Sequence, residues 1–245
     1  MPGAETEPGC TGIIITGVGK DFKGMEKIED ITDDLELALS LERFGRYLEW
    51  SGGDRARAVE LYTLNTKVSE CLYTPLQMLE VALRNRIHAV MTGAYHETWF
   101  QDRAIILQER QAEQVAKAIS DIEAERKEVT PGRIVAALTF SFWTSMFGTD
   151  YETLWQQTLH RIARRADGKG LRRKDFSGPL SQVRTIRNRI AHHEPIIAWD
   201  LRKHYGNIAA MTEWLSPAAA AWCRAHCRFE EVYPLERIVL LERGR

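Results

Sequence analysis

Three polar side chains within one short segment are of the types that could cleave RNA. Arg187, Asn188 and His192 lie in the stretch RTIRNRIAHHEP, residues 184–195. If this segment is helical, Asn188 and His192 are four residues apart and share a face, whereas Arg187 lies about 140° around the helix from His192. Pro195 disfavours a helical conformation at the residue before it. We therefore expect His192 to lie near the C-terminal end of the helix, partly exposed.

These residue types suit RNA cleavage without a metal ion. A base must take the proton from a 2′-hydroxyl, which then attacks the neighbouring phosphate, and an imidazole titrates near neutral pH. Arg187 would stabilise the charge that builds on the phosphate, and Asn188 would orient His192 or hold the phosphate. A structural interpretation stays open, because Arg and His near a helix C-terminus also stabilise the helix dipole. Burial of His192 inside a helix bundle would exclude the catalytic interpretation.

Further polar residues accompany this segment. Glu80 lies inside an apolar run, and Arg84 follows it one helical turn later. The two either form an intrahelical ion pair or line the same cleft, where a buried carboxylate would need Arg as its partner. His193 and Glu194 directly follow His192, and they could hydrogen-bond its ring or cap the helix end.

Basic residues are concentrated around the same segment. The formal net charge is -1, yet residues 161–189 contain ten Lys or Arg and two Asp, whereas acidic residues crowd the segment 26–42. Phosphates meet a local patch rather than the total charge, so a polyanionic partner is compatible with this composition. A solvated loop and helix face is the alternative interpretation. The candidate RNA-binding residues are Arg164, Arg165, Lys169, Arg172, Arg173, Lys174, Arg184 and Arg189.

Composition favours a reduced, cytoplasmic protein. No apolar run approaches the roughly 20 residues that cross a membrane, and the short apolar stretch 12–18 lacks the pattern of a secretory signal. The four Cys show no disulfide framework. Cys223, His226 and Cys227 could ligate a metal, but a zinc site needs a fourth ligand that is not evident, so we expect neither metal nor cofactor. Gly17–Lys20 lacks the glycine spacing of a phosphate-binding loop.

The positions of apolar residues predict an all-α chain of 245 residues. We expect a tail at 1–28, one helical domain at 29–235 and a C-terminal tail at 236–245. Pro75 permits a break or kink in a long apolar stripe between Asp54 and Val90. One helix is predicted to begin at Pro131 and to carry the apolar run 134–147. The remaining helices are predicted at 37–50, 103–129, 151–164, 179–191, 201–215 and 216–229. A basic loop is expected at 164–177, and the only strand candidates are 13–16 and 238–241.

Several ordered blocks resemble the Abi-like branch of the HEPN superfamily, which is associated with bacterial abortive infection. Arg187 to His192 is similar to the R-N-x-x-x-H signature of HEPN domains, and 193–196 resembles its continuation in the Abi-like branch. Upstream blocks resemble that branch in the same order. These blocks are 43–48, 61–65, 79–87, Trp99 and 138–143. The resemblance covers about 43–199.

This resemblance implies a HEPN-like helical bundle with additional helices that forms a homodimer, bringing two signature helices into one RNA cleft. It implies metal-independent endoribonuclease activity leaving 2′,3′-cyclic phosphate ends, and toxicity used against phage and restrained by a protein or RNA antitoxin. By motif position, Arg187 and His192 take the catalytic roles with Asn188. Glu80, Arg84 and His193 are supporting residues. Because some HEPN domains are inactive, a non-catalytic RNA-binding or protein-interaction module is the alternative, and a helical scaffold unrelated to defence is a third possibility.

Overall fold

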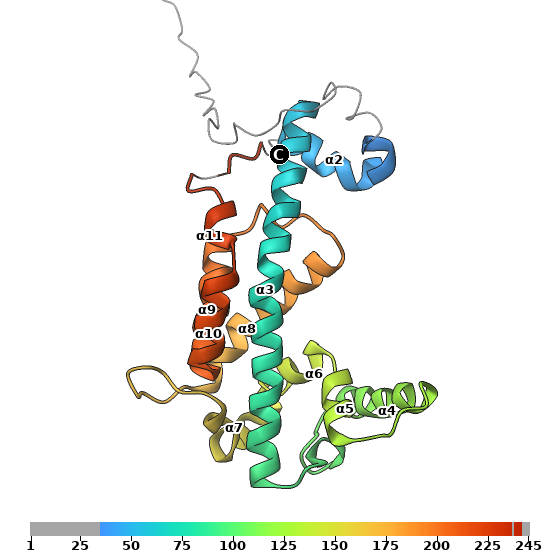
Figure 1. Ribbon diagram of the computed structural model, residues 1–245, viewed down its shortest axis with the longest axis vertical. Helices are drawn as coiled ribbons and strands as arrows, with labels where there is room; N and C mark the ends of the chain where they lie inside the picture. The colour runs from blue at the N-terminus through green and yellow to red at the C-terminus, as the bar shows by residue number, and fades with distance from the viewer. Residues whose placement is uncertain (1–34, 237, 242–245) are drawn as a thin grey trace, which may run out of the picture.

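A computed structural model describes residues 35–236 and 238–241 of the chain (Figure 1). Within these residues every regular element is a helix, so the all-α prediction is confirmed. The predicted N-terminal tail and the strand candidate 13–16 lie outside the described residues, as do 237 and 242–245 of the C-terminal tail. In the described segments, no helix has both the length and the apolar character that a membrane crossing would need.

Helix α3, Arg55–Ala94, is 40 residues long and runs along most of the molecule (Figure 1). Asp54 caps it, because its carboxylate accepts a hydrogen bond from the Arg57 amide at 3.0 Å. The helix continues through Pro75 without a break. Pro75 lacks the amide that would bond the Cys71 carbonyl. The Cys227 thiol donates to that carbonyl instead, at 3.5 Å, so a tertiary contact compensates for the proline.

A small aromatic cluster closes one end of the molecule. A helical turn at 35–39 leads into α2, Leu41–Trp50, which packs on the first turns of α3. Tyr47 is 1% exposed and meets Trp50 and Tyr62 edge to face. The segment 238–241 joins this cluster, and its Leu241 amide donates to the Trp50 carbonyl at 2.9 Å. The strand candidate 238–241 does not form a strand, because its backbone pairs with a helix end.

The middle of the chain forms shorter helices than the sequence predicts. Helix α4 spans Glu109–Ala124 and not 103–129, since Asp102 accepts from the Ala104 amide at 2.8 Å and holds the preceding segment in a turn. The apolar run 134–147 divides into α5, Pro131–Ala137, and α6, Phe140–Ser145. Leu138 is extended at the break, which lets α6 turn its aromatic side chains into the core.

The predicted helix at 151–164 is also divided. Helix α7 spans Glu152–Gln157, and a 3₁₀ turn follows at Leu159–Ile162. Two other 3₁₀ turns lie outside this segment or at its start, at Trp99–Gln101 and Thr149–Tyr151. Thr158 separates α7 from the 3₁₀ turn at Leu159–Ile162. It is buried, and its hydroxyl lies 3.4 Å from the Tyr95 hydroxyl. A polar side chain that is satisfied by a distant partner thus interrupts the local helical pattern.

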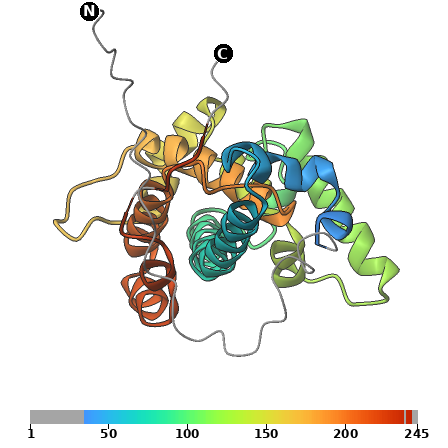
Figure 2. The ribbon, with the colours of Figure 1, turned by 90° about the horizontal axis from the view of Figure 1, so that it is seen from above.

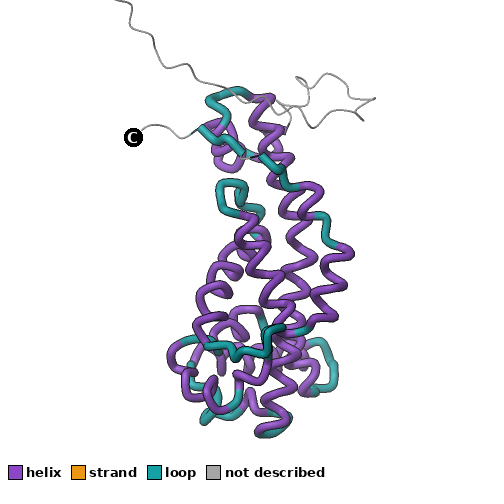
Figure 3. Tube along the Cα trace, turned by 90° about the vertical axis from the view of Figure 1, so that its left-hand side faces the viewer, coloured by secondary structure: helices purple, strands orange, loops and turns teal. Residues whose placement is uncertain are grey.

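The C-terminal third supplies the remaining helices. Helix α8 spans Arg173–Ala191 and crosses α3, while α9, Leu201–Leu215, and α10, Pro217–His226, lie alongside α3 (Figure 1). Figure 3 shows that helices make up most of the described chain and that loops join them. A last short helix, α11, spans Phe229–Val232. Helix α8 begins six residues before the predicted start at Pro179. Asp175 makes this possible, because its carboxylate accepts from the Arg172 amide at 2.9 Å and so helps cap the helix start.

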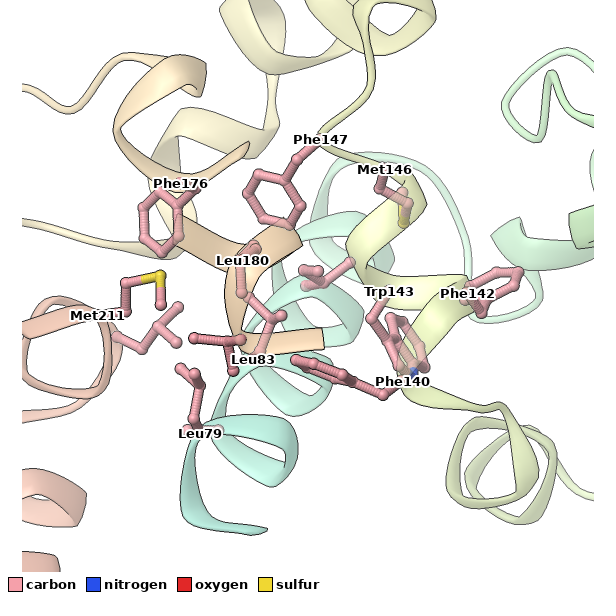
Figure 4. Close-up of a cluster of buried hydrophobic side chains, with 14 of the residues drawn as sticks. Leu79, Leu83, Phe140, Phe142, Trp143, Met146, Phe147, Phe176, Leu180 and Met211 are labelled. Atoms are coloured by element: carbon pink, nitrogen blue, oxygen red, sulfur yellow. The ribbon is translucent and has the colours of Figure 1, made fainter. Parts of the chain in front are cut away.

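The main core lies where α3, α6, α8 and α9 meet (Figure 4). Leu83 of α3, Trp143 of α6 and Phe176 of α8 are each 0% exposed. Burial of one such side chain contributes roughly 1.5–3 kcal/mol. These contacts fix the first half of α8 in place, so the polar residues near its C-terminus extend from a rigid support.

Candidate functional site

Helix α8 ends in a tight turn that exposes two histidines. His192 is the C-terminal cap, and His193 follows in the left-handed conformation with φ 56°. The His193 amide donates to the Ile190 carbonyl at 3.0 Å, and the Glu194 amide donates to the Arg189 carbonyl at 2.8 Å. These two bonds form a Schellman motif, in which the left-handed position is usually Gly. Both His side chains are exposed to solvent, as Pro195 led us to expect for His192.

The chain beyond His192 is held by buried and charged contacts. Asn65 of α3 is 5% exposed, and its Oδ1 accepts from the Ile196 amide at 2.7 Å. Arg189 donates from Nε to the Pro195 carbonyl at 3.2 Å. It also lies 3.4 Å from the Glu194 carboxylate and stacks on Trp199 at 5.2 Å. Arg189 therefore braces this turn, a role different from the RNA contact predicted for it.

Arg187 projects from another side of α8 and meets α3. Its Nε lies 3.6 Å from Oε2 of Glu80, and the two side chains are 42% and 23% exposed. Among the described residues the Arg187 side chain makes this ion pair and no hydrogen bond, so donors of its guanidinium stay available to phosphate oxygens.

Glu80 therefore pairs across two helices, and the intrahelical pair with Arg84 does not form. Arg84 donates instead to the Ala136 carbonyl at the end of α5, at 3.4 Å. Its Nε is buried without a partner. Glu80 and Arg187 come together near the end of α8, whereas Arg84 joins α3 to α5.

Asn188 and Arg184 face away from Arg187, toward α4 and α6. They line one wall of a pocket of about 240 Å³, which the first turns of α4 and residues of α6 complete. The angular step between neighbouring helical residues is about 100°, so Arg187 and Asn188 necessarily face different surroundings. Asn188 and His192 remain on one face of α8, as the spacing predicts, and the pocket begins one turn before His192.

The basic loop uses several of its charges within the protein. It spans 163–172 and projects away from the helices (Figure 2). Arg165 contacts Asp175 at 3.2 Å and stacks on Trp214 at 5.5 Å. Arg172 also reaches Asp175, at 3.1 Å, and the backbone amide of Arg172 lowers the pKa of that carboxyl. Lys169 lies 3.2 Å from Asp167.

Arg173 departs furthest from its predicted role. It is 8% exposed, with Nε 2.5 Å from a Glu152 carboxylate oxygen and Nη1 2.5 Å from the Phe147 carbonyl. Its hydrogen bond lowers the pKa of Glu152. The prediction that Arg173 contacts RNA does not fit this burial. Arg164 and Lys174 are exposed and have no ion-pair partner among the described residues, so they remain available to a phosphate.

The C-terminal Cys and His residues lie in a different part of the fold, on α10. Cys223 is buried, and burial raises the pKa of its thiol to about 11. Cys227 donates to the Cys71 carbonyl, and His226 packs on Trp222 at 4.6 Å. Across 35–236 and 238–241, no three His, Cys, Asp or Glu side chains gather in a way that could hold a metal ion.

Sequence reasoning missed the residues on α4 that form the other wall of the pocket. Gln108, Gln111 and Gln114 recur every third residue on one side of this segment, and Arg110 accompanies them. Three amides at a spacing of three on a predicted helix are a signal that could have indicated a polar surface. Their proximity to Asn188 depends on how α4 packs against α8, which the spacing does not contain.

Comparison with known proteins gives a single family. The model of a family described as "Abi-like protein" matches residues 37–198. The match includes α8, the turn that follows it, and Glu80 on α3. No curated protein and no solved structure matches the chain. Because the matched segment covers more than half of the sequence and contains the whole candidate site, the chain belongs to the Abi-like protein family.

Proposed function

We propose that this Abi-like protein is a metal-independent endoribonuclease of the HEPN type that acts as a toxin in abortive-infection defence against phage. The observation that carries the proposal is the exposure of His192 at the fixed end of α8, with Arg187 nearby on the same helix. A base must reach a polynucleotide, and an imidazole enclosed by the bundle could not do so. Family membership supports the role in abortive infection.

In this mechanism His192 accepts the proton of a ribose 2′-hydroxyl. The resulting oxygen attacks the adjacent phosphorus, and the bond to the 5′-oxygen of the next nucleotide breaks. The leaving oxygen takes a proton from water to become a 5′-hydroxyl, and a 2′,3′-cyclic phosphate remains. Arg187 stabilises the charge on the phosphate oxygens through its two Nη groups, while Glu80 holds the side chain at Nε. Asn188 contacts the phosphate or the substrate beside it. No step needs a metal ion.

The proposal includes assembly and regulation. Two copies of the chain pair so that two α8 ends border one RNA cleft, and an antitoxin of protein or RNA restrains the activity. The protein surface that binds RNA receives positive charge from Arg164, Lys174 and Arg184. Three more cations, Arg165, Lys169 and Arg172, already contact carboxylates, and they bind RNA through their remaining donors. The protein acts in the cytoplasm, where its RNA substrate is found.

The test is incubation of the purified protein with total cellular RNA in EDTA, followed by mapping of the cleaved ends. We expect cleavage that leaves cyclic phosphates, and a loss of roughly 10²–10⁴-fold in rate for His192→Ala. His226→Ala is the matched control, because His226 is also exposed and lies on α10. This control should cleave at the wild-type rate.

Two results would contradict the proposal. Cleavage that continues unchanged in His192→Ala would remove the assigned base. RNA binding that weakens with salt, without any cleavage by the wild-type protein, would instead support the non-catalytic module. Growth arrest on expression should follow the same pattern, lost in His192→Ala and retained in His226→Ala.

A further inference from the structure

The pocket beside Asn188 has an unusual set of polar groups. Its lining comprises four amide side chains, two hydroxyls and two guanidinium groups, contributed by α4, α6, α8 and Gln108 just before α4. At about 240 Å³ it is far larger than the roughly 30 Å³ that a water molecule occupies in the liquid. The pocket can therefore receive a polar organic group rather than one ordered water.

One side of the pocket is already fixed by internal hydrogen bonds. Gln111 is 1% exposed, and its Nε2 donates to the Phe142 carbonyl at 2.9 Å while its Oε1 accepts from the Tyr151 hydroxyl at 2.5 Å. Gln108 donates to Asp150 at 3.0 Å. These bonds satisfy both polar atoms of the Gln111 amide and make this wall rigid.

Other groups that line the pocket have unused hydrogen-bonding capacity. Among residues 35–236 and 238–241, the side chains of Arg110, Arg184 and Asn188 have neither a hydrogen bond nor an ion pair. Two unpaired guanidinium groups from different helices, α4 and α8, thus line the same pocket. Neighbouring like charges are unfavourable unless an anion lies between them, so this arrangement favours a phosphate.

A buried acceptor adds a second requirement. Gln114 donates from Nε2 to the Ser141 hydroxyl at 3.1 Å, whereas its Oε1 is buried and has no partner. A buried carbonyl oxygen without a donor costs roughly 1–3 kcal/mol. A ligand in the pocket that places an N–H or O–H against this oxygen, after a shift of the Gln114 amide toward it, would remove this cost. A nucleotide carries an anion and several donors on its base and ribose, so it can meet both requirements at once.

The pocket ends one helical turn before His192, on the face of α8 that His192 shares with Asn188. Arg184, Asn188 and His192 follow one another at intervals of four along α8, and each interval advances about 6 Å along the helix axis. A strand whose scissile phosphate lies at His192 would therefore bring its next nucleotide to Asn188 and Arg184.

We propose that this pocket is a nucleotide subsite of the ribonuclease, in which Arg110 and Arg184 bind the phosphate next to the cleaved bond and Gln114 accepts a hydrogen bond from the base or ribose. The subsite rests on the proposed function, since it assigns part of the same RNA strand. It selects which nucleotide lies beside the cut, whereas His192 and Arg187 act on the bond itself.

The test uses a short single-stranded RNA with one 2′-deoxynucleotide at the cleavage position, so that binding is measured without cleavage. Arg184→Gln and Arg110→Gln should each raise the Kd about 10-fold at fixed salt. Lys117→Gln is the matched control, because Lys117 is an exposed cation on α4 that pairs with Asp121 and does not line the pocket. Its Kd should stay close to that of the wild-type protein.

The second readout is the sequence around the cut. Gln114→Leu keeps the approximate side-chain size but removes both the acceptor and the donor to Ser141, and it should change which nucleotides flank the cleaved bonds. The subsite is overturned if the Arg variants bind like Lys117→Gln, if Gln114→Leu cuts at the same sites as wild type, or if inorganic phosphate competes for the RNA as strongly as nucleoside monophosphates do.

The two proposals fail in different ways. Persistent cleavage by His192→Ala together with weak binding by Arg184→Gln would overturn the base assignment and keep the subsite. Loss of cleavage in His192→Ala together with normal binding by Arg184→Gln would do the reverse.

Discussion

The two ends of helix α8 carry similar side chains and use them differently. At its start, Arg173 is buried and binds Glu152 and a carbonyl, and Arg172 contacts Asp175. Toward its end, Arg184 and Asn188 have no partner in the part of the chain that the structure describes, and His192 is exposed. Local charge density is highest near the start of the helix, yet unused hydrogen-bonding capacity is concentrated near its end.

This difference shows why a count of Lys and Arg is a weak guide to a phosphate site. A cation that already has a buried carboxylate or carbonyl partner stabilises the fold, and its removal leaves buried acceptors unpaired. A cation without a partner adds little to folding and is available to a ligand. Substitution of Arg173 at the start of α8 should therefore change stability, whereas substitution of Arg184 or His192 near its end should change activity.

The largest expected effect belongs to Arg173. Arg173→Ala should lower the free energy of unfolding by about 2–3 kcal/mol, because it leaves the Phe147 carbonyl unpaired and removes a charged hydrogen bond to Glu152. Urea denaturation followed by circular dichroism measures this. Arg172→Ala is the neighbouring control, since the Arg172 side chain is 81% exposed and should contribute less than about 0.5 kcal/mol. Equal losses in the two variants would remove the distinction between paired and exposed cations.

An intermediate effect is expected in the turn that ends α8. His193→Gly should raise the free energy of unfolding by about 1 kcal/mol, because Gly adopts the left-handed conformation without the steric cost that His bears. Arg126→Gly is a matched variant. Arg126 has the same φ of 56° at the end of α4, where the same pair of hydrogen bonds forms. A gain at Arg126 alone would mean that the His193 side chain makes a stabilising contact that offsets its backbone cost.

The smallest effect on stability is expected at Glu80. Its pair with Arg187 is partly exposed, so Glu80→Gln should cost only about 0.5 kcal/mol, yet it should lower the cleavage rate about 10-fold by releasing Arg187 from its position. Glu70→Gln is the control, because Glu70 lies on the same helix and pairs with Arg228 in an exposed contact. Faster cleavage by Glu80→Gln would show that Glu80 restrains Arg187 and does not position it.

Local sequence patterns determined the helical character of the chain and the end of the site helix. The spacing of apolar residues along α3 and α9 predicts helices, and Asp54 and Pro217 mark starts that the structure confirms. Pro195 predicts that α8 ends near His192, because the restriction acts on the adjacent residue. These features depend on neighbours within about four residues, and such interactions can be read from the chain itself.

Tertiary packing decided the partners and the boundaries. Helical spacing favours an ion pair between Glu80 and Arg84, but α3 and α8 cross so that Glu80 pairs with Arg187 instead. The start of α8 at Arg173 depends on the Asp175 cap and on Glu152 from another helix. The pocket exists only because α4, α6 and α8 meet. Apart from the local Asp175 cap, each of these contacts joins residues far apart along the chain, so its energy depends on the packed arrangement and leaves no periodic trace in the sequence.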